Sequence, residues 1–388
     1  MNSKKVKFII FGLIVFIFGG ICGIGVSKIY SDRGVFSFVN KKLSGSEYQE
    51  FKDMKKRYEK AEKLIALVKK YYYQDVKDED INEGIYKGIF AGLGDKYSSY
   101  MTKKEYALYE TAVTGEFEGI GVTVTENKNR QIEIINTIKD SPAEKEGLKK
   151  GDIIKKVDGK RYSELDKAVM AMRGRRGTTV QLVVLRKNKY LEFNVRRAKI
   201  VNNTVMEKII EGNIGYIKIT AFENKTAEAF IRALERMEKK GVKGLIVDLR
   251  DNGGGLVNAG VGVADKLLGK GIITFTKDKY GNKQYYKSDA RKTRLPYVVL
   301  VNENTASASE IISAAIKDLG PGKIVGVRTY GKGVIQISQP VGDGSGLKLT
   351  IMQYFSPKGN VIHKKGVKPD YEVKGRQNQL KKAIQLLR

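Results

Sequence analysis

The longest run of apolar positions in the chain extends from Phe8 to Val26, directly after a segment that contains three lysines. A run of about nineteen apolar residues is near the minimum for a helix that spans a bilayer. Basic residues in front of such a run keep the N-terminus in the cytoplasm and place the rest of the chain on the other side. A cleaved signal peptide is the alternative, but no A-x-A-like site follows the run. The pattern predicts an uncleaved, single-pass anchor in the cell membrane.

Two segments with helical spacing of apolar residues follow a polar tether. Apolar side chains recur every three or four positions from Glu47 to Tyr73, with dense charge between them, and again from Ile81 to Leu93. A turn of sequence GDKYSSY occupies residues 94–100. Its aromatic side chains could stack on a ligand, but we interpret them as packing around the turn. The helical segments near the two ends of the chain also allow a homodimer.

Short strands dominate the pattern after residue 115. The segments SPAEKEGL and GDIIKKVDG lie among them, and a short helix is predicted from Glu164 to Met172. Alternating apolar positions predict strands at 119–124, 132–135, 179–186 and 190–196. Together these segments resemble a PDZ domain over about eighty residues, and the pattern SPA…GL..GD.I..V.G is the specific part of the match.

The loop that opens this PDZ-like region contains two glycines. Its residues are Gly119, Ile120, Gly121 and Val122. Glycines let successive backbone N–H groups converge, and such a concave group of donors can bind the terminal carboxylate of a peptide. An extended peptide can then pair with the edge of the following strand. An ordinary glycine hairpin is the alternative, but the downstream pattern favours a carboxylate-binding loop.

Strands and longer helices alternate from Ile214 to Val373, which predicts an α/β core. The helices show apolar residues at helical spacing, and one strand is apolar throughout, as expected for a buried strand. The predicted elements are the strand Ile214–Ile219, the helix Lys225–Lys240, the strand 244–249, the helix Gly260–Leu268 and the strands Ile272–Lys277 and Tyr297–Asn302. A short charged helix is predicted at Gln377–Leu387.

Composition narrows the possible partners. The 388 residues include 72 Lys and Arg against 43 Asp and Glu, which gives a net charge of +29. Such an excess suits nucleic acid, membrane phosphate or another anionic polymer. The basic residues are spread along the chain, however, so we interpret them as a solvated, lysine-rich surface. We expect no nucleic-acid partner.

The chain has one cysteine, Cys22, and one histidine, His363. A single thiol cannot form an intrachain disulfide, and zinc sites of the usual His and Cys kind are excluded. We expect neither a metal nor a cofactor. His363 lies in a hairpin-like stretch beside two lysines and is interpreted as a solvated turn residue. A serine hydrolase built from this chain therefore requires lysine as its base.

A serine stands where a buried strand turns into a helix. The sequence VVLVNENTASASEI, residues 298–311, combines a strand, a short turn and a helix that begins near Ser307. A hydroxyl at a helix N-terminus lies close to free N–H groups, which stabilise a developing anion. Capping of the helix by Thr305, Ser307 or Ser309 is the alternative. Capping needs only one hydroxyl, and the small residues around Ser307 would leave room for a substrate backbone.

A lysine between two glycines is a candidate base. The segment GVRTYGKGVIQ, residues 326–336, nearly matches the phosphate-binding pattern G-x-x-x-x-G-K-[ST]. Gly333 replaces the hydroxyl residue and a strand follows, which disfavours nucleotide binding. Apolar neighbours would desolvate Lys332 and lower its pKa, so that a neutral amine could accept a proton. Gln336 lies four residues further, on the same face of a strand, and could orient the amine.

A third segment, DLRDNGGG at residues 248–255, ends a strand in three glycines whose N–H groups could form an oxyanion hole. With these three segments the chain resembles the S41 peptidases, the carboxy-terminal processing or tail-specific proteases. The PDZ-like region and the stretch LGDKYSSYM extend the resemblance over roughly residues 60–372. The resemblance implies Ser307 as the nucleophile, Lys332 as the general base and Gln336 as the residue that steadies the lysine.

The resemblance also implies the donors of the oxyanion hole. These are the N–H of Ala308 and one N–H from the glycine run, for which we favour Gly254 over Gly253. Thr305 departs from the family, in which serine is common at this position, but the residue belongs to neither catalytic role.

The predicted fold is an α/β, crotonase-like protease core with an inserted, β-rich PDZ domain and an N-terminal transmembrane helix. The expected segments are a cytoplasmic tip with the anchor (1–28), a tether (29–46), a helical region (47–112), the PDZ domain (113–198), the protease core (199–373) and a C-terminal helix (374–388). The resemblance implies a serine endopeptidase whose PDZ domain gates or presents substrate tails. The predicted anchor places it on the extracytoplasmic side, and we expect the Gly119–Val122 loop to bind protein or peptide substrates with apolar C-terminal tails. An inactive PDZ scaffold and a basic polymer-binding protein are the alternatives, and neither explains the three segments together.

Overall fold

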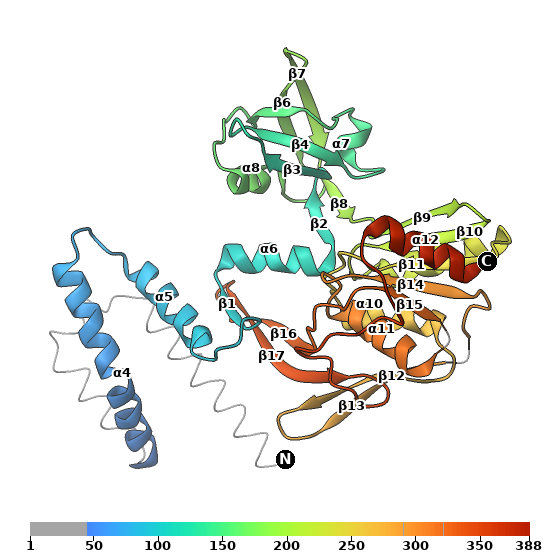
Figure 1. Ribbon diagram of the computed structural model, residues 1–388. Helices are drawn as coiled ribbons and strands as arrows, with labels where there is room; N and C mark the ends of the chain where they lie inside the picture. The colour runs from blue at the N-terminus through green and yellow to red at the C-terminus, as the bar shows by residue number, and fades with distance from the viewer. Residues whose placement is uncertain (1–44, 290, 321) are drawn as a thin grey trace. The chain divides into compact units, whose positions relative to one another are not determined.

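The structure is a computed structural model that describes residues 45–289, 291–320 and 322–388 (Figure 1). The chain divides into two compact units, residues 1–85 and 86–388. The first unit contains α4 (Gly45–Tyr71) and the beginning of α5 (Asp78–Ala91). Three acidic residues stand in the first turn of α5, where they complement the positive end of the helix dipole.

The predicted membrane anchor, Phe8–Val26, lies outside the described residues. Within the ranges that the structure describes, no helix is both long enough and apolar enough to cross a membrane. Helix α4 is long, but charged residues alternate with its apolar residues along its length. Large apolar side chains such as Leu64 and Leu67 are exposed.

The second unit contains the rest of α5, followed by β1 (Ser99–Met101) and α6 (Lys103–Thr114). Thr102 and Glu105 form a capping box at the start of α6, and Gly115 ends the helix with a left-handed φ of 68°. A two-stranded antiparallel ribbon of β2 (Glu116–Gly119) and β8 (Ala198–Val201) follows. The chain between these two strands forms a separate domain.

This inserted domain is a five-stranded antiparallel sheet in the order β3-β4-β5-β6-β7. Its strands are β3 (Val122–Glu126), β4 (Ile132–Thr137), β5 (Ile153–Val157), β6 (Thr179–Arg186) and β7 (Lys189–Arg196). Helices α7 (Pro142–Lys145) and α8 (Leu165–Met172) pack on the strands (Figure 1). Alternate residues of β6 are fully buried, so the domain has a hydrophobic core of its own.

The loop between β2 and β3 is the predicted carboxylate-binding loop. The N–H groups of Ile120 and Gly121 donate no hydrogen bond to any other described residue, although both residues are buried. Their carbonyl oxygens accept from Ala143 and Ile138. Gly121 has a φ of 85°, and a Cβ there would lie 2.3 Å from Cβ of Ser141, so only glycine fits.

The remaining chain forms an α/β core around a six-stranded sheet in the order β18-β15-β14-β11-β10-β9. All neighbouring strands are parallel except β9 and β10. The strands are β9 (Val205–Ile210), β10 (Ile214–Ile219), β11 (Gly244–Asp248), β14 (Tyr297–Val301), β15 (Lys323–Gly326) and β18 (Tyr371–Glu372).

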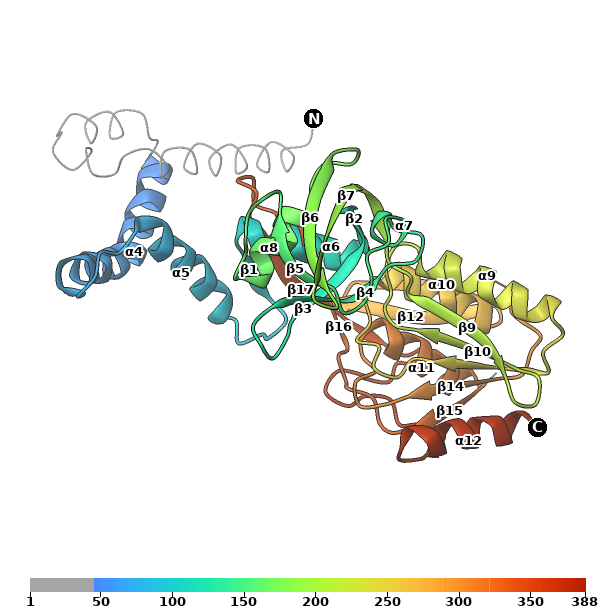
Figure 2. The same ribbon diagram turned by 90° about the horizontal axis from the view of Figure 1, so that it is seen from above.

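Helices cover both faces of this sheet, because its central strands are apolar on both sides. One face packs against α9 (Thr226–Lys239), α10 (Val257–Leu267) and α11 (Ala308–Leu319). The other face packs against α12 (Arg376–Leu387) (Figure 2). Alternation along β14 divides its residues between the two cores: Val299 and Val301 face the first, and Val298 and Leu300 face the second.

A second sheet, antiparallel throughout, joins β1, β17, β12 and β13, with β16 paired to β17. Its further strands are β12 (Gly271–Asp278), β13 (Lys283–Ser288), β16 (Val334–Pro340) and β17 (Gly346–Phe355). Gly333 alone separates Lys332 from β16, and the turn that contains Tyr97 leads into β1. This sheet therefore carries Lys332 and the aromatic turn, whereas the parallel sheet carries Ser307 and the glycine run.

Candidate active site

Ser307 lies between β14 and α11, at the N-terminal end of the helix. Its backbone has φ 56° and ψ −119°, a conformation that residues other than glycine rarely adopt. Thr305 stabilises the preceding turn: its hydroxyl donates to Leu249 O at 2.9 Å and accepts from Asn302 N at 2.9 Å. Ala306 N donates to Asn252 O at 3.0 Å. The surroundings thus hold Ser307 in a strained conformation of the kind that clusters at functional sites.

The first turn of α11 has a free donor next to Ser307. The N–H of Ala308 makes no hydrogen bond to any residue in the described ranges, as expected for the first positions of a helix. The positive end of the helix dipole adds to the attraction that this N–H offers to an anion. The oxyanion role that the resemblance implies for Ala308 stays a prediction.

One carboxylate, that of Glu310, joins the serine segment to the lysine segment. Its Oε2 accepts from Ser307 N at 2.9 Å and from Lys332 N at 2.8 Å. Its Oε1 accepts from the Thr329 hydroxyl at 2.6 Å and from Gly331 N at 2.7 Å. The side chain is fully buried, and burial raises the pKa of Glu310 while its hydrogen bonds act in the opposite direction. Glu310 therefore fixes the backbones of both candidate catalytic residues.

Tyr354 on β17 makes a second connection between the same two segments. Its hydroxyl lies 3.0 Å from Ser307 O and also donates to Lys332 O. The ring is completely buried, and burial raises the pKa of Tyr354 well above its ordinary value, so the hydroxyl stays protonated as a donor. Glu310 binds the two segments through their N–H groups and Tyr354 through their carbonyl oxygens.

The side chain of Lys332 lies in surroundings that favour the neutral amine. Burial is the largest cause that lowers the pKa of Lys332, and the charge of Lys348 lowers it further. Lys332 Nζ lies 5.0 Å from the centroid of the Tyr97 ring. Among the described side chains it makes no hydrogen bond with the Ser307 hydroxyl, an arrangement common in catalytic pairs without substrate.

Among the described residues, Gln336 makes no hydrogen bond with Lys332. Its Nε2 donates to the Thr350 hydroxyl at 3.1 Å. A common face for Lys332 and Gln336 requires strand alternation from Lys332 onward, but β16 begins only at Val334. The side chain of Lys332 is therefore not bound to the face of β16 that carries Gln336.

Gly254 lies directly against Ser307. A Cβ at Gly254 would stand 2.6 Å from Ser307 Cβ and 2.8 Å from Ala306 O, and the residue has a φ of 98°. Its N–H, however, already donates to Asn252 Oδ1 at 2.9 Å. Gly254 could serve the predicted oxyanion role only if this hydrogen bond were shared or broken.

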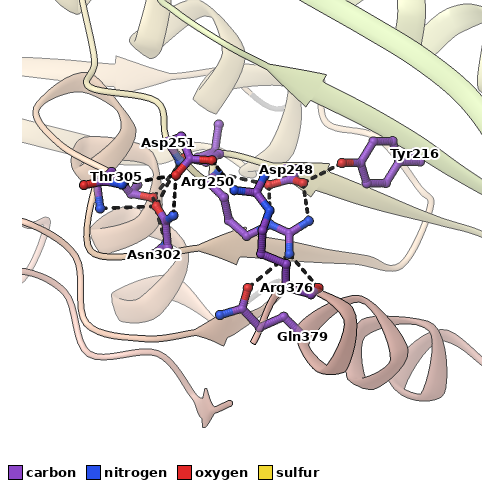
Figure 3. A network of polar contacts seen from close by, with 10 residues as sticks. Tyr216, Asp248, Arg250, Asp251, Asn302, Thr305, Arg376 and Gln379 are labelled. Carbon is purple, nitrogen blue, oxygen red and sulfur yellow. Dashed lines mark hydrogen bonds and ion pairs between the residues drawn. The ribbon is translucent and has the colours of Figure 1, made fainter. Parts of the chain in front are cut away.

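A buried ion pair supports the segment before the glycine run (Figure 3). Arg250 donates to both oxygens of Asp248, at 2.9 and 2.6 Å, and Tyr216 donates to Asp248 at 2.5 Å. Burial and the nearby Asp248 raise the pKa of Tyr216 to about 12. Arg250 also donates to Gln379 Oε1 of α12 at 3.1 Å.

The next residue, Asp251, continues this network (Figure 3). It has a left-handed φ of 62°, and its carboxylate pairs with Arg376 of α12 and accepts from Asn302 at 2.7 Å. Arg376 and Asn302 hold the pKa of Asp251 well below its usual range. Helix α12 is thereby bonded to the two residues that lead into the glycine run.

His363 is not the fully solvated turn residue that the sequence predicts. It is half-buried, its Nδ1 accepts from Gly333 N at 3.4 Å, and its ring centroid lies 6.4 Å from that of Tyr97. Burial, helped by Lys364, lowers the pKa of His363. No described hydrogen bond connects it to Ser307, so its contacts are with the lysine segment.

A cavity of about 510 Å³ adjoins the site. It is lined by residues that follow the glycine run, such as Leu256 and Val257, and by Ile335 and Gln336, which follow Lys332. None of its lining residues is charged. The cavity can therefore accept an uncharged group.

Three residues of the site were missed by the sequence analysis: Glu310, Tyr354 and Tyr97. Glu310 stands three residues after Ser307, which is the spacing of a capping box, so the sequence did contain a pattern that marks it. Tyr354 and Tyr97 reach the site through strand pairing, and no local pattern indicates their proximity.

Three family profiles match the chain. They are peptidase family S41 over residues 213–373, the PDZ domain over residues 119–196 and the N-terminal domain of the activating protease CtpB over residues 22–105. The carboxy-terminal processing protease CtpA of Bacillus subtilis (strain 168) is 38% identical over 318 residues, which cover 81% of this chain and 68% of the relative. The carboxy-terminal processing protease CtpB of the same organism is 34% identical over 383 residues, which cover 96% of this chain and 78% of the relative.

A solved structure agrees with these relatives. The photosystem II D1 C-terminal processing protease aligns with a TM-score of 0.50 and 29% identity, over 83% of this chain and 90% of that chain. Fold, site and relatives define a serine-type peptidase with a PDZ domain. The chain belongs to peptidase family S41 and is a carboxy-terminal processing protease. The predicted α/β core and PDZ domain are confirmed.

Proposed function

We propose that this chain cleaves peptide bonds with Ser307 as the nucleophile and Lys332 as the general base. The observation that carries the proposal is the Glu310 carboxylate, which accepts hydrogen bonds from the N–H groups of both residues. A shared buried acceptor keeps the two segments at a fixed separation, as a pair that reacts together requires. The lowered pKa of Lys332 supports a role as a base near neutral pH.

In the proposed reaction the neutral amine of Lys332 takes the proton of the Ser307 hydroxyl while Ser307 Oγ attacks the peptide carbonyl carbon. The carbonyl oxygen becomes an oxyanion next to the free N–H of Ala308. Lys332 then gives its proton to the leaving amine, and an ester of Ser307 remains. Water hydrolyses this ester by the same steps, with Lys332 again as the base.

Two further residues have supporting roles in this proposal. Gln336 would orient the amine of Lys332, which requires its side chain to leave Thr350. Gly254 would supply a second oxyanion donor when its N–H turns from Asn252 to the substrate. The uncharged cavity next to Gln336 would hold an apolar side chain of the substrate.

The PDZ domain is proposed to bind the free C-terminal carboxylate of substrates with apolar tails. The loop Gly119–Val122 would provide the donors, since the N–H groups of Ile120 and Gly121 have no partner within the described residues. The edge of β3 would then pair with the tail.

Amidation of the substrate tail should weaken both binding and cleavage, because it removes the charge that the loop would bind. The measurement compares unstructured protein substrates that are identical except for a free or amidated C-terminus. A substrate with a terminal aspartate serves as the control for tail composition. Equal rates for free and amidated tails would contradict the proposed carboxylate role.

The segment Phe8–Val26 is proposed to anchor the protein, with the residues after Lys28 on the extracytoplasmic side. A protease added to intact cells from which any outer barrier has been removed should therefore degrade most of the chain. A cytoplasmic marker protein must survive in the same sample. Degradation only after lysis would refute this placement. A homodimer stays a prediction.

A further inference from the structure

The turn before β1 places an aromatic ring next to Lys332. Tyr97 lies in this turn and is half-buried, and Lys332 Nζ lies 5.0 Å from its ring centroid. Lys96 Nζ lies 5.0 Å from the same centroid and donates to the Tyr330 hydroxyl at 2.8 Å. A cation within about 6 Å of an aromatic centroid is attracted by the negative face of the ring. The ring of Tyr97 is therefore a binding place for the ammonium form of Lys332.

The position of Tyr97 is fixed by several hydrogen bonds. The carboxylate of Asp95 accepts from Tyr97 N at 3.1 Å and from the Ser98 hydroxyl at 2.6 Å. Thr350 N on β17 donates to the Ser98 hydroxyl at 2.9 Å. β1 also pairs with β17, the strand that carries Tyr354. These bonds hold the Tyr97 ring in place relative to β17, the strand whose Tyr354 hydroxyl binds the carbonyl oxygen of Lys332.

We propose that Tyr97 is a positioning residue that holds the protonated side chain of Lys332 out of hydrogen-bonding distance of Ser307 and releases it on deprotonation. The inference rests on the proposed roles of Ser307 and Lys332. A neutral amine is not attracted to the ring as an ammonium is, so loss of the proton frees the side chain to reach the serine hydroxyl. The Tyr97 ring affects the protonation equilibrium of the Lys332 amine. Glu310 and Tyr354 instead hold the backbones of Ser307 and Lys332 in place.

The direction of the effect follows from which form the ring favours. Attraction to the ring stabilises the ammonium, so it opposes the burial that lowers the pKa of Lys332. Removal of the ring should lower this pKa further and make the neutral base available at lower pH.

The charged and titratable groups near Lys332 come from every element around it. Lys348 on β17 repels the ammonium, while Asp95, Tyr330 and Glu310 attract it. Lys96 and His363 lie beside the Tyr97 ring itself. A substitution that changes only the ring leaves all these charges in place.

The test is the pH dependence of kcat/KM for cleavage of one peptide by the full-length protein and its variants. Tyr97→Leu should move the acid limb of the profile to lower pH by about 0.5–1 unit, the size expected of a partly desolvated cation–π contact. At a pH on that limb, activity relative to the plateau should rise about 3- to 10-fold. Tyr97→Phe keeps the ring and should keep the limb within about 0.2 unit of the wild type.

A second variant covers the case in which Tyr97→Leu does not fold. Tyr97→pentafluorophenylalanine preserves the shape of the ring but reverses the charge distribution over its face, so it should shift the acid limb in the same direction as Tyr97→Leu. Tyr280→Leu is the matched control, because Lys279 Nζ lies 4.9 Å from that exposed ring, far along the chain from the site. It should leave the profile unchanged.

The outcomes separate this inference from the proposed function. If Ser307→Ala cleaves like the wild type, the proposed function fails. If cleavage depends on Ser307 but the acid limb stays in place in Tyr97→Leu and in the fluorinated variant, Tyr97 has no such role. Equal shifts in Tyr97→Phe and Tyr97→Leu would assign the effect to the hydroxyl and would also overturn the inference.

Discussion

Ser307→Ala and Lys332→Ala should each reduce peptide cleavage by a factor of about 10⁴ or more, and the double variant should be little worse. The residues act as one unit, because the base has nothing to deprotonate without the hydroxyl and the hydroxyl is unreactive without the base. Lys332→Arg should be as inactive as Lys332→Ala, since a guanidinium stays protonated near neutral pH. The measurement is single-peptide cleavage by purified variants, with folding checked by thermal unfolding.

The serine substitution has a matched control on the same helix. Ser313 is also a buried serine of α11, and its hydroxyl donates to Ser309 O at 2.8 Å. Ser313→Ala should keep activity within a few-fold of the wild type. Substantial turnover by Lys332→Arg would rule out the lysine as the base. Loss of activity in His363→Ala, with Lys332→Ala still active, would support a histidine mechanism in its place.

Gly254→Ala should reduce cleavage by about 100-fold or more, whereas Gly253→Ala should have a small effect. The added Cβ at Gly254 would lie 2.6 Å from Ser307 Cβ and 2.8 Å from Ala306 O, and its backbone φ of 98° strains any residue with a side chain. The nucleophile or the glycine run must then move, and a displacement of about 1 Å is enough for a loss of this order. The strain should also lower the free energy of unfolding by about 1–3 kcal/mol.

Gly253→Ala is the matched control for this prediction. A Cβ at Gly253 meets no atom within 4 Å, and its φ lies outside the left-handed region. The pair is compared by kcat/KM on one peptide and by denaturant unfolding. Equal activity of the two variants would mean that Gly254 does not lie against the nucleophile in the working enzyme.

Helix positions could be predicted from the sequence because the spacing of apolar residues indicates which face of a helix is buried. The helix expected at Lys225–Lys240 is α9, Thr226–Lys239, and the strand expected at 179–186 is β6 with the same bounds. The helix expected at Gly260–Leu268 begins earlier, at Val257. Its first turn follows the glycine run and lines the cavity described above, where local spacing carries less information.

The antiparallel sheet of β12, β13, β16 and β17 was not foreseen as a unit. Its strands come from separate parts of the chain, and their pairing depends on register across long loops, which apolar alternation does not encode. The contact of Tyr97 with Lys332 depends on the same pairing, which explains why the aromatic turn was interpreted only as packing.

The site could be predicted in part. Ser307 and Lys332 can be recognised from the sequence because their neighbours are unusual. Several small residues surround Ser307 at the start of a helix, and Lys332 lies between two glycines in an apolar segment. The structure brings their backbones together through Glu310 and Tyr354. Gln336 donates to Thr350, and its contact with Lys332 stays a prediction: Lys332 precedes β16, which begins at Val334, so the alternation of a strand does not extend to it.

The contacts of α12 with Arg250 and Asp251 have a consequence for the order of folding. The partners are separated by 125 residues for Asp251 and Arg376, and by 129 for Arg250 and Gln379. Contacts between residues so far apart form late, because a long loop must close before they contribute. During synthesis Asp248 and Arg250 are therefore made long before α12, the helix that later packs against Arg250. The segment that leads into the glycine run can reach its final conformation only after α12 has been synthesised. A partly synthesised chain should therefore not yet be an active protease.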